Sequence, residues 1–228
     1  MAPQLAARYP RIRSYVGRSI AHPEVEARLD DSPLGFSAMI RGLGDVVMLQ
    51  PVSLGEGANY ISFRRAALGA AVEPFHCLVD GQFSLAAQLR DATQPTPSPT
   101  PQTITGAQVR TYRLAVAATG EYTATFGGTV AAGMAAIVQA INRINGIYLT
   151  DLSVQFQLVN GNDQLVYTTA ATDPYTNNNG GAMLGENQTN IDTVIGTANY
   201  DFGHVFSTGG GGVADVGVPC TAGSKAQG

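Results

Sequence analysis

The order of the hydrophobic periodicities in residues 106–228 constrains the fold more than any other feature of the sequence. A largely apolar run at 111–118 predicts an interior strand. Residues 152–159 alternate apolar and polar side chains, as a half-buried strand does. Between these runs, apolar residues recur every three or four positions over 130–144, which predicts an amphipathic helix. A strand, a helix and a second strand form a right-handed crossover, so we expect the two strands to be parallel.

The same pattern continues toward the end of the sequence. Thr129 is the expected N-cap of the first helix, and Asn145 with Gly146 is the expected stop signal. Residues 184–198 predict a second helix, and residues 202–207 predict a third strand.

A glycine run, 209–212, separates the third strand from a last predicted strand at 213–217. Because this turn is short, the last strand is expected to run antiparallel to its predecessor. The order strand, helix, strand, helix, strand, strand predicts an α/β fold with a mixed, mostly parallel twisted sheet and two helices.

The first 90 residues predict a small β-rich unit, with a hairpin formed around the glycines at 42 and 44. Short apolar or alternating runs give its expected strands: 11–16, 35–40, 46–51, 59–63 and 75–79.

A proline-rich segment, 91–105, divides the chain. Its four prolines alternate with Thr, Ser and Gln, which favours an extended, solvated linker. The expected organisation is therefore a β-rich domain at 1–90, a linker at 91–105 and an α/β segment at 106–228.

The composition excludes several classes of partner. The net charge is −4 and no basic stripe is present, which argues against nucleic-acid binding. No apolar run approaches the roughly 20 residues of a membrane span. Only 13% of the residues are charged, and this low charge with many Thr, Asn and Gly residues is typical of secreted proteins. No signal peptide is recognisable, so either the protein is cytosolic or its leader is not part of this sequence. We expect the second, a secreted protein.

Side chains with catalytic potential are few. The three histidines, His22, His76 and His204, are too far apart in sequence to form an H-E-x-x-H pair. No G-x-S-x-G elbow occurs, and the glycine run lacks the G-K-[ST] of a phosphate loop. A hydrolase whose carboxylates or nucleophile meet only in the fold stays an open alternative.

The two cysteines, Cys77 and Cys220, are far apart and form no C-x-x-C motif. Either they pair with each other or Cys220 pairs with a cysteine outside this sequence, and we expect the second arrangement because the two lie in different predicted domains.

Three stretches resemble the bacterial reprolysin-like (M12B-type, metzincin) zinc metallopeptidases. They are RTYRLAVAATGEY at 110–122, INRINGIY at 141–148 and GHVFSTGGGGVA at 203–214. Residues 17–65 are similar to the pro-segment of that family. The chain therefore looks like a pro-segment followed by the N-terminal half of a catalytic domain.

The resemblance implies a zincin-like fold, in which a peptide or protein substrate adds as a strand to an antiparallel edge strand. By position, this substrate-binding edge comprises Gly212, Val213, Ala214, Asp215 and Val216.

The family's zinc-binding histidines, glutamate base and Met-turn find no match in this sequence. The resemblance thus implies zinc in the full-length protein, whereas this chain, truncated before the zinc helix, is expected to bind none and to be inactive alone. It also offers Cys77 as a cysteine switch that would occupy the zinc, although a buried structural role suits its apolar neighbours better.

The leading hypothesis is a zinc-dependent metalloendopeptidase. The alternative is a non-catalytic secreted binding or adhesion module made of two small domains.

Overall fold

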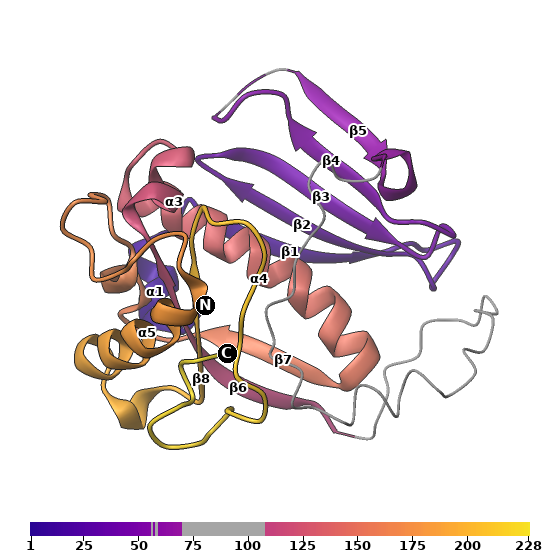
Figure 1. Cartoon of the computed structure of the whole chain (residues 1–228). Helices are drawn as coiled ribbons and strands as arrows, with labels where there is room; N and C mark the ends of the chain where they lie inside the picture. Colours follow the sequence, from indigo (N-terminus) through magenta and orange to yellow (C-terminus); the bar gives the residue numbers. More distant parts are fainter. Residues whose placement is uncertain (56, 58, 70–107) are drawn as a thin grey trace.

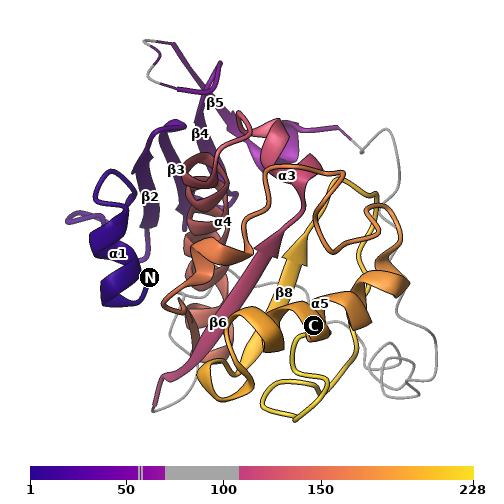
Figure 2. The ribbon, with the colours of Figure 1, turned by 90° about the vertical axis from the view of Figure 1, so that its left-hand side faces the viewer.

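The structure, a computed structural model, describes residues 1–55, 57, 59–69 and 108–228. The described chain forms successive layers (Figures 1 and 2). A five-stranded sheet lies behind a long helix, α4; a three-stranded sheet follows, and a second helix, α5, covers the far side of that sheet. The predicted α/β fold is confirmed. The predicted linker at 91–105 lies outside the described residues.

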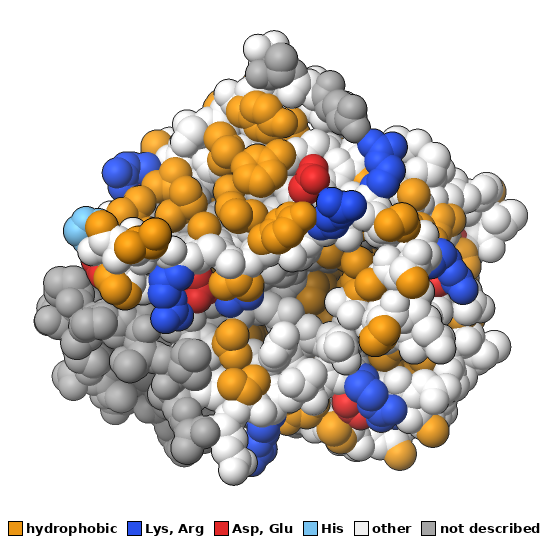
Figure 3. Space-filling model, turned by 180° about the vertical axis from the view of Figure 1, so that it is seen from behind, with side chains coloured by type: hydrophobic (Ala, Val, Ile, Leu, Met, Phe, Trp, Pro, Cys, Tyr) orange, Lys and Arg blue, Asp and Glu red, His pale blue; other side chains and the backbone are white. Residues whose placement is uncertain are grey.

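The N-terminal sheet is an antiparallel meander in which each strand pairs with the next along the chain. One face of this sheet turns toward α4; Figure 3 looks onto the other, where hydrophobic side chains gather. The predicted strand at 75–79 lies outside the described residues. The strands are β1 (Arg13–Arg18), β2 (Glu26–Ser32), β3 (Gly35–Arg41), β4 (Val47–Pro51) and β5 (Tyr60–Arg64).

The second sheet has β6 (Arg110–Ala118) at its centre, with β7 (Val154–Leu158) and β8 (Phe202–Phe206) on either side. Both neighbours are parallel to β6, as the crossover argument predicts. The two are staggered, since Leu114 of β6 pairs with the last residue of β7 and with the first residue of β8. The β8 strand therefore extends the sheet at the C-terminal end of β6.

The helix α4 (Val130–Leu152) joins β6 to β7 and is longer than predicted. Thr129 caps it as expected, with its hydroxyl accepting a hydrogen bond from the Ala132 amide at 3.2 Å. The helix ends only at Ser153, which adopts a left-handed conformation with φ of 55°.

The expected stop at Asn145 and Gly146 is wrong because tertiary contacts occupy both residues. The Asn145 side chain accepts from the Phe156 amide at 2.7 Å and donates to the Phe156 carbonyl at 2.9 Å, so it satisfies backbone groups of β7. Gly146 is buried inside the helix, and a Cβ there would lie 2.9 Å from Cγ of Arg28. Glycine here permits close approach to the N-terminal sheet rather than ending the helix.

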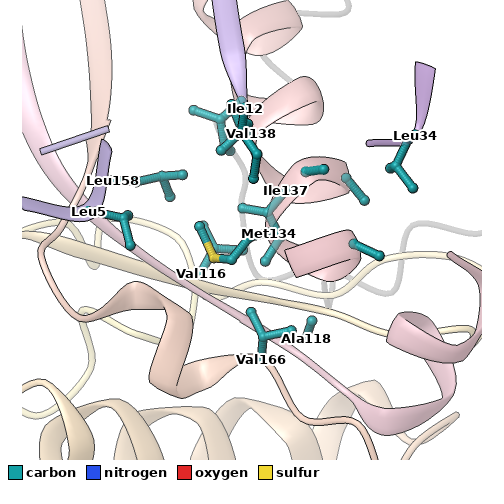
Figure 4. Packing of buried hydrophobic residues seen from close by; sticks show 14 of the residues in the cluster. Leu5, Ile12, Leu34, Val116, Ala118, Met134, Ile137, Val138, Leu158 and Val166 are labelled. Atoms are coloured by element: carbon teal, nitrogen blue, oxygen red, sulfur yellow. The ribbon is translucent and has the colours of Figure 1, made fainter. Parts of the chain in front are cut away.

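Alternate residues of β6 enter two different hydrophobic clusters. Val116 and Ala118 pack with Met134 and Ile137 of α4 in the first cluster (Figure 4). Ala115 and Ala117 belong to the second cluster and contact the side of the sheet that α5 (Gly180–Val194) covers. Asn179 caps this helix. The central strand is thus buried on both faces, as its apolar sequence predicts.

The N-terminal segment contributes to the first cluster. Leu5, Ile12 and Leu34 are buried in it together with side chains of α4 and β6 (Figure 4). The Ala2 amide also donates to the carbonyl of Leu158, the last residue of β7, at 2.7 Å. Residues on both sides of the predicted linker therefore share one core, while the domain boundaries themselves stay a prediction.

Several short helices were not predicted from the sequence. They are α1 (Pro3–Arg8), α3 (Gly120–Thr125) and the 3₁₀ helices Arg65–Ala67, Asn162–Leu165 and Thr197–Asn199.

The interface between α4 and the N-terminal sheet is largely polar. The Asn142 side chain donates to the Asp30 carboxylate at 3.0 Å, and the Gln139 side chain donates to the Ser37 hydroxyl. The Arg41 guanidinium donates to the Gly146 carbonyl. The sheet is therefore attached to α4 through directional hydrogen bonds as well as through the apolar contacts at one end.

Asp30 is the most buried carboxylate of this interface, with 3% of its surface exposed. Burial raises its pKa above the ordinary 3.8, although hydrogen bonds from Ser14 and Asn142 and the charges of Arg143 and Arg28 lower it. One oxygen of Asp30 has no hydrogen-bond partner. The ionised form is thus incompletely stabilised.

We predict that Asp30 makes stability depend on pH. Because its folded-state pKa is raised, its contribution to the free energy of unfolding is fully present below the unfolded pKa and is lost as the pH rises through the folded pKa. Asp30→Asn should flatten this part of the pH profile, whereas Asp31→Asn, a change at an exposed neighbour, should not. Urea unfolding between about pH 4 and pH 7 measures both profiles; equal slopes for the two variants would contradict the assignment.

Candidate functional site

The segment expected to form the antiparallel edge strand does not form one. Gly212 is a single bridge residue, residues 213–215 have no regular conformation, and Val216 with Gly217 forms a turn. The prediction of a strand at 213–217 is wrong because left-handed glycines bend the chain at both ends, with φ of 87° at Gly211 and 80° at Gly217.

C-terminal residues lie between this segment and β8. The Gly203 amide of β8 donates to the Lys225 carbonyl at 2.7 Å, and the Asp215 amide donates to the Gln227 carbonyl at 2.8 Å. Residues 225–227 therefore follow β8, and residues 213–215 lie outside them. Asp215, one of the predicted edge residues, is thus attached to the protein through Gln227. We call residues 213–215 the rim.

Lys225, the one lysine of the sequence, anchors this C-terminal segment. Its ammonium donates to the carbonyls of Thr197 and Tyr200, the second at 2.7 Å, and it lies 4.1 Å from the centre of the Tyr200 ring. Sequence reasoning did not identify this role, because the two carbonyls come from a loop about 25 residues away.

The helix α5 holds the neighbouring residue, Ala226, by two side-chain amides. Asn187 donates to the Ala226 carbonyl at 2.6 Å, and the Ala226 amide donates to Gln188 at 2.8 Å. Asn187 also accepts from the Tyr175 hydroxyl at 2.9 Å and is 1% exposed. Asn187 opens an N-Q-T sequon, but its side chain in the folded protein is fully used in these bonds.

A cavity of about 390 Å³ lies between β8, the glycine run and the N-terminal end of α5. Its walls mix apolar and polar groups, and they include Met183, Asn187, His204, Phe206, Val213 and Gly228. The predicted edge segment therefore borders a cavity through Val213.

His204 lies at this cavity. Its Nδ1 is 2.6 Å from the Gly228 carbonyl oxygen, and its ring meets Phe206 edge-on at 5.1 Å. Burial lowers the pKa of His204 below 6.5, while the hydrogen bond to Gly228 opposes that shift. The imidazole is therefore neutral at pH 7 and donates from Nδ1 to the carbonyl.

Half-buried aromatic rings line the face of the sheet next to α4. Phe202 stacks on Phe156 of β7 with ring centres 5.9 Å apart, and Phe206 stacks on Tyr122 at 5.2 Å. Burial raises the pKa of Tyr122 to about 12. These rings pack at the margin of the α4 cluster, so the helix covers the β8 end of this face incompletely.

The described residues do not offer a zinc site. No three His, Cys, Asp or Glu side chains within the described ranges are grouped so that they could hold a metal ion. His22 is exposed and lies 3.4 Å from Glu24, and Cys220 is an exposed free thiol. His76 and Cys77, the predicted cysteine switch, lie outside the described residues. A catalytic zinc requires three protein ligands, so these side chains do not fit one.

Comparison with known families identifies the second half of the chain. A model of the M12B reprolysin-like metallopeptidases matches residues 108–227. This chain belongs to that metallopeptidase family. No curated protein and no solved structure gives a match.

The family match covers all of the three-stranded sheet, α4, α5 and the glycine run, together with every cavity wall residue except Gly228. The family expectation drawn from the sequence is therefore confirmed for this part of the reprolysin-like chain. The N-terminal sheet lies outside the match. No helix of the described residues is long and apolar enough to cross a membrane.

We predict that Asn187 is a main determinant of stability at this site. Asn187→Ala removes the donor to the buried Ala226 carbonyl and the acceptor of the Tyr175 hydroxyl, which keeps only the bond from Asn190, and should lower the free energy of unfolding by about 2–4 kcal/mol. Thr189→Ala removes the same sequon but changes only an exposed hydroxyl, so its effect should stay within about 0.5 kcal/mol. Urea unfolding distinguishes the two variants, and an equal effect of both would contradict the role of Asn187.

Proposed function

We propose that this protein is a secreted zinc-dependent metalloendopeptidase, and that residues 108–228 form the substrate-facing half of its catalytic domain. The observation that carries the proposal is the family match over the whole three-stranded sheet and both covering helices. Residues 1–90 act as its pro-segment. The sparse charge of the chain supports secretion.

The rim at residues 213–215 binds an extended peptide. In an extended chain, successive backbone groups turn to opposite sides. The Asp215 amide donates to the Gln227 carbonyl, and in this proposal the amide of Ala214, one residue earlier, faces the bound peptide. A peptide that adds to this rim gains main-chain hydrogen bonds, and the cavity beside Val213 receives one of its side chains.

Zinc, in this proposal, is held by residues outside the printed sequence, and it supplies the activated water for peptide hydrolysis. Residues 1–228 bind no zinc and hydrolyse no peptide by themselves. What they supply is the sheet on which the peptide is aligned. His204, neutral and bonded to Gly228, contributes to the cavity wall and not to metal binding.

We predict that purified residues 1–228, dialysed against buffer, contain much less than about one zinc per chain and do not cleave denatured casein. Elemental analysis and release of acid-soluble peptides measure the two properties. Stoichiometric zinc, or cleavage that a chelator abolishes, would contradict the proposed division of roles.

The nucleotide sequence that follows the Gly228 codon tests the enzyme class itself. An H-E-x-x-H-x-x-G-x-x-H-like helix within roughly 40 residues supports the peptidase. A stop codon in an intact gene would instead favour the non-catalytic binding module.

We also predict that the rim binds peptides through its backbone. Ala214→Pro removes one outward amide and should weaken binding of labelled, oxidised insulin B chain by about tenfold, which corresponds to roughly 1.4 kcal/mol. Ala214→Ser keeps that amide and should bind like the unchanged chain. Fluorescence anisotropy measures both; equal affinities for the two variants would exclude this rim as the peptide site.

A further inference from the structure

The second hydrophobic cluster ends at the cavity beside β8. Met183 of α5 and Ala226 are buried members of that cluster, and Val205 of β8 packs against it. All three residues also line the cavity. The helix and the strand lie next to each other in both ribbon views (Figures 1 and 2). One part of the cavity wall is therefore continuous with an apolar core.

The rim reaches this cavity through Val213. A Cβ on Gly180, the first residue of α5, would lie 2.5 Å from Cγ1 of Val213. Glycine at this position therefore lets the rim side chain pack directly on the helix. In the glycine run, a Cβ on Gly210 would meet no heavy atom of the described residues within 4 Å. The glycine run thus leaves open space at the cavity wall.

The wall of the cavity is uncharged. None of the described residues that line it is Asp, Glu, Lys or Arg. Three polar side chains of the wall, Asn187, His204 and Ser207, already bond to other groups of the protein. A charged group that entered the cavity would lose its water shell without gaining a counter-ion, which is strongly unfavourable. An apolar group that entered it would gain from the hydrophobic effect.

The volume suits one large side chain. An apolar cavity of about 150 Å³ binds benzene, and pockets that bind ligands begin at about 300 Å³. At about 390 Å³ this cavity accommodates the side chain of leucine, methionine or phenylalanine. The flexible thioether of Met183 adjusts to side chains of different shape.

We propose that this cavity is a specificity pocket that selects a large, uncharged apolar side chain of the peptide on the rim. The selection rests on the proposed function, because it requires a peptide at residues 213–215. What it adds is the class of side chain and the residues that choose it. Val213 joins the rim to the pocket, Met183 supplies apolar wall, and the uncharged lining rejects lysine, arginine, aspartate and glutamate side chains.

A peptide panel tests the selection. Labelled peptides of the sequence Gly-Thr-Ser-Thr-X-Thr-Ser-Thr-Gly, with leucine, phenylalanine, lysine or glutamate at X, are titrated with the full chain and followed by fluorescence anisotropy. The leucine and phenylalanine peptides should bind at least about tenfold more tightly than the charged ones. Equal affinities for peptides that do bind would overturn the selection and leave the proposed function standing. Failure of every peptide to bind would contradict the rim as a peptide site and the pocket with it.

A matched pair of variants assigns the preference to the pocket. Val213→Asp places a carboxylate in the wall and should shift the preference toward the lysine peptide by about tenfold. Val109→Asp makes the same change at a valine that is 46% exposed and lies outside the cavity wall, so the preference for leucine should stay. Far-UV circular dichroism checks that both variants are folded. An unchanged preference in a folded Val213→Asp variant would contradict the assignment.

Toluene and benzylammonium probe the cavity without any peptide. In protein with ¹³C-labelled methionine methyl groups, toluene should shift the NMR resonance of Met183 and leave that of Met39, a residue of β3, unchanged. Benzylammonium has the same ring with a positive charge and should shift neither resonance. Absence of a toluene shift at Met183, or equal shifts from the two compounds, would overturn the apolar pocket whatever the peptides do. A toluene shift without peptide binding would retain the cavity and reject a peptide as its occupant.

Discussion

The packing of α4 between two sheets is the interaction on which the rest of the structure depends. One side of the helix is apolar and forms the first cluster with β6, where Met134 and Ile137 are fully buried. The other side carries Gln139, Asn142 and Gly146 against the N-terminal sheet. One side of α4 covers β6 and the other side covers the N-terminal sheet. Loss of α4 packing would therefore expose both β6 and the buried charges of β2. The two sheets are therefore coupled through a single helix.

This arrangement gives the family assignment a physical meaning. The part that matches the metallopeptidases consists of a parallel sheet, two covering helices and a glycine-bordered rim. Its rim is attached through residues 225–227, which Lys225 and Asn187 fix to the body of the protein. A peptide-binding rim needs a rigid support and an accessible backbone. For the proposed rim, the bonds of Lys225 and Asn187 supply the support, whereas no group of metal ligands is present among the described residues.

The sequence predicts the elements with strong periodicity well, because local pattern and burial agree there. Strands β6 and β7 and the helix α4 follow from alternation and from three-to-four spacing. The prediction failed where tertiary contacts override local signals, as at Gly146, which a close approach of Arg28 explains. It missed β2, whose inward positions are charged and therefore break the apolar pattern of a strand. It also predicted a strand at 213–217, where single glycines with positive φ decide the path of the chain and Lys225, distant in sequence, fixes the residues alongside.

We expect the described residues of the N-terminal sheet and of 108–228 to unfold as one cooperative unit around α4. Native-state hydrogen exchange, followed by mass spectrometry at low urea concentrations, tests it most directly. The amides of β2 and β3 should open with the same free energy and the same urea dependence as those of β6. Exchange of β2 and β3 at a much lower free energy, with β6 and α4 still protected, would contradict it.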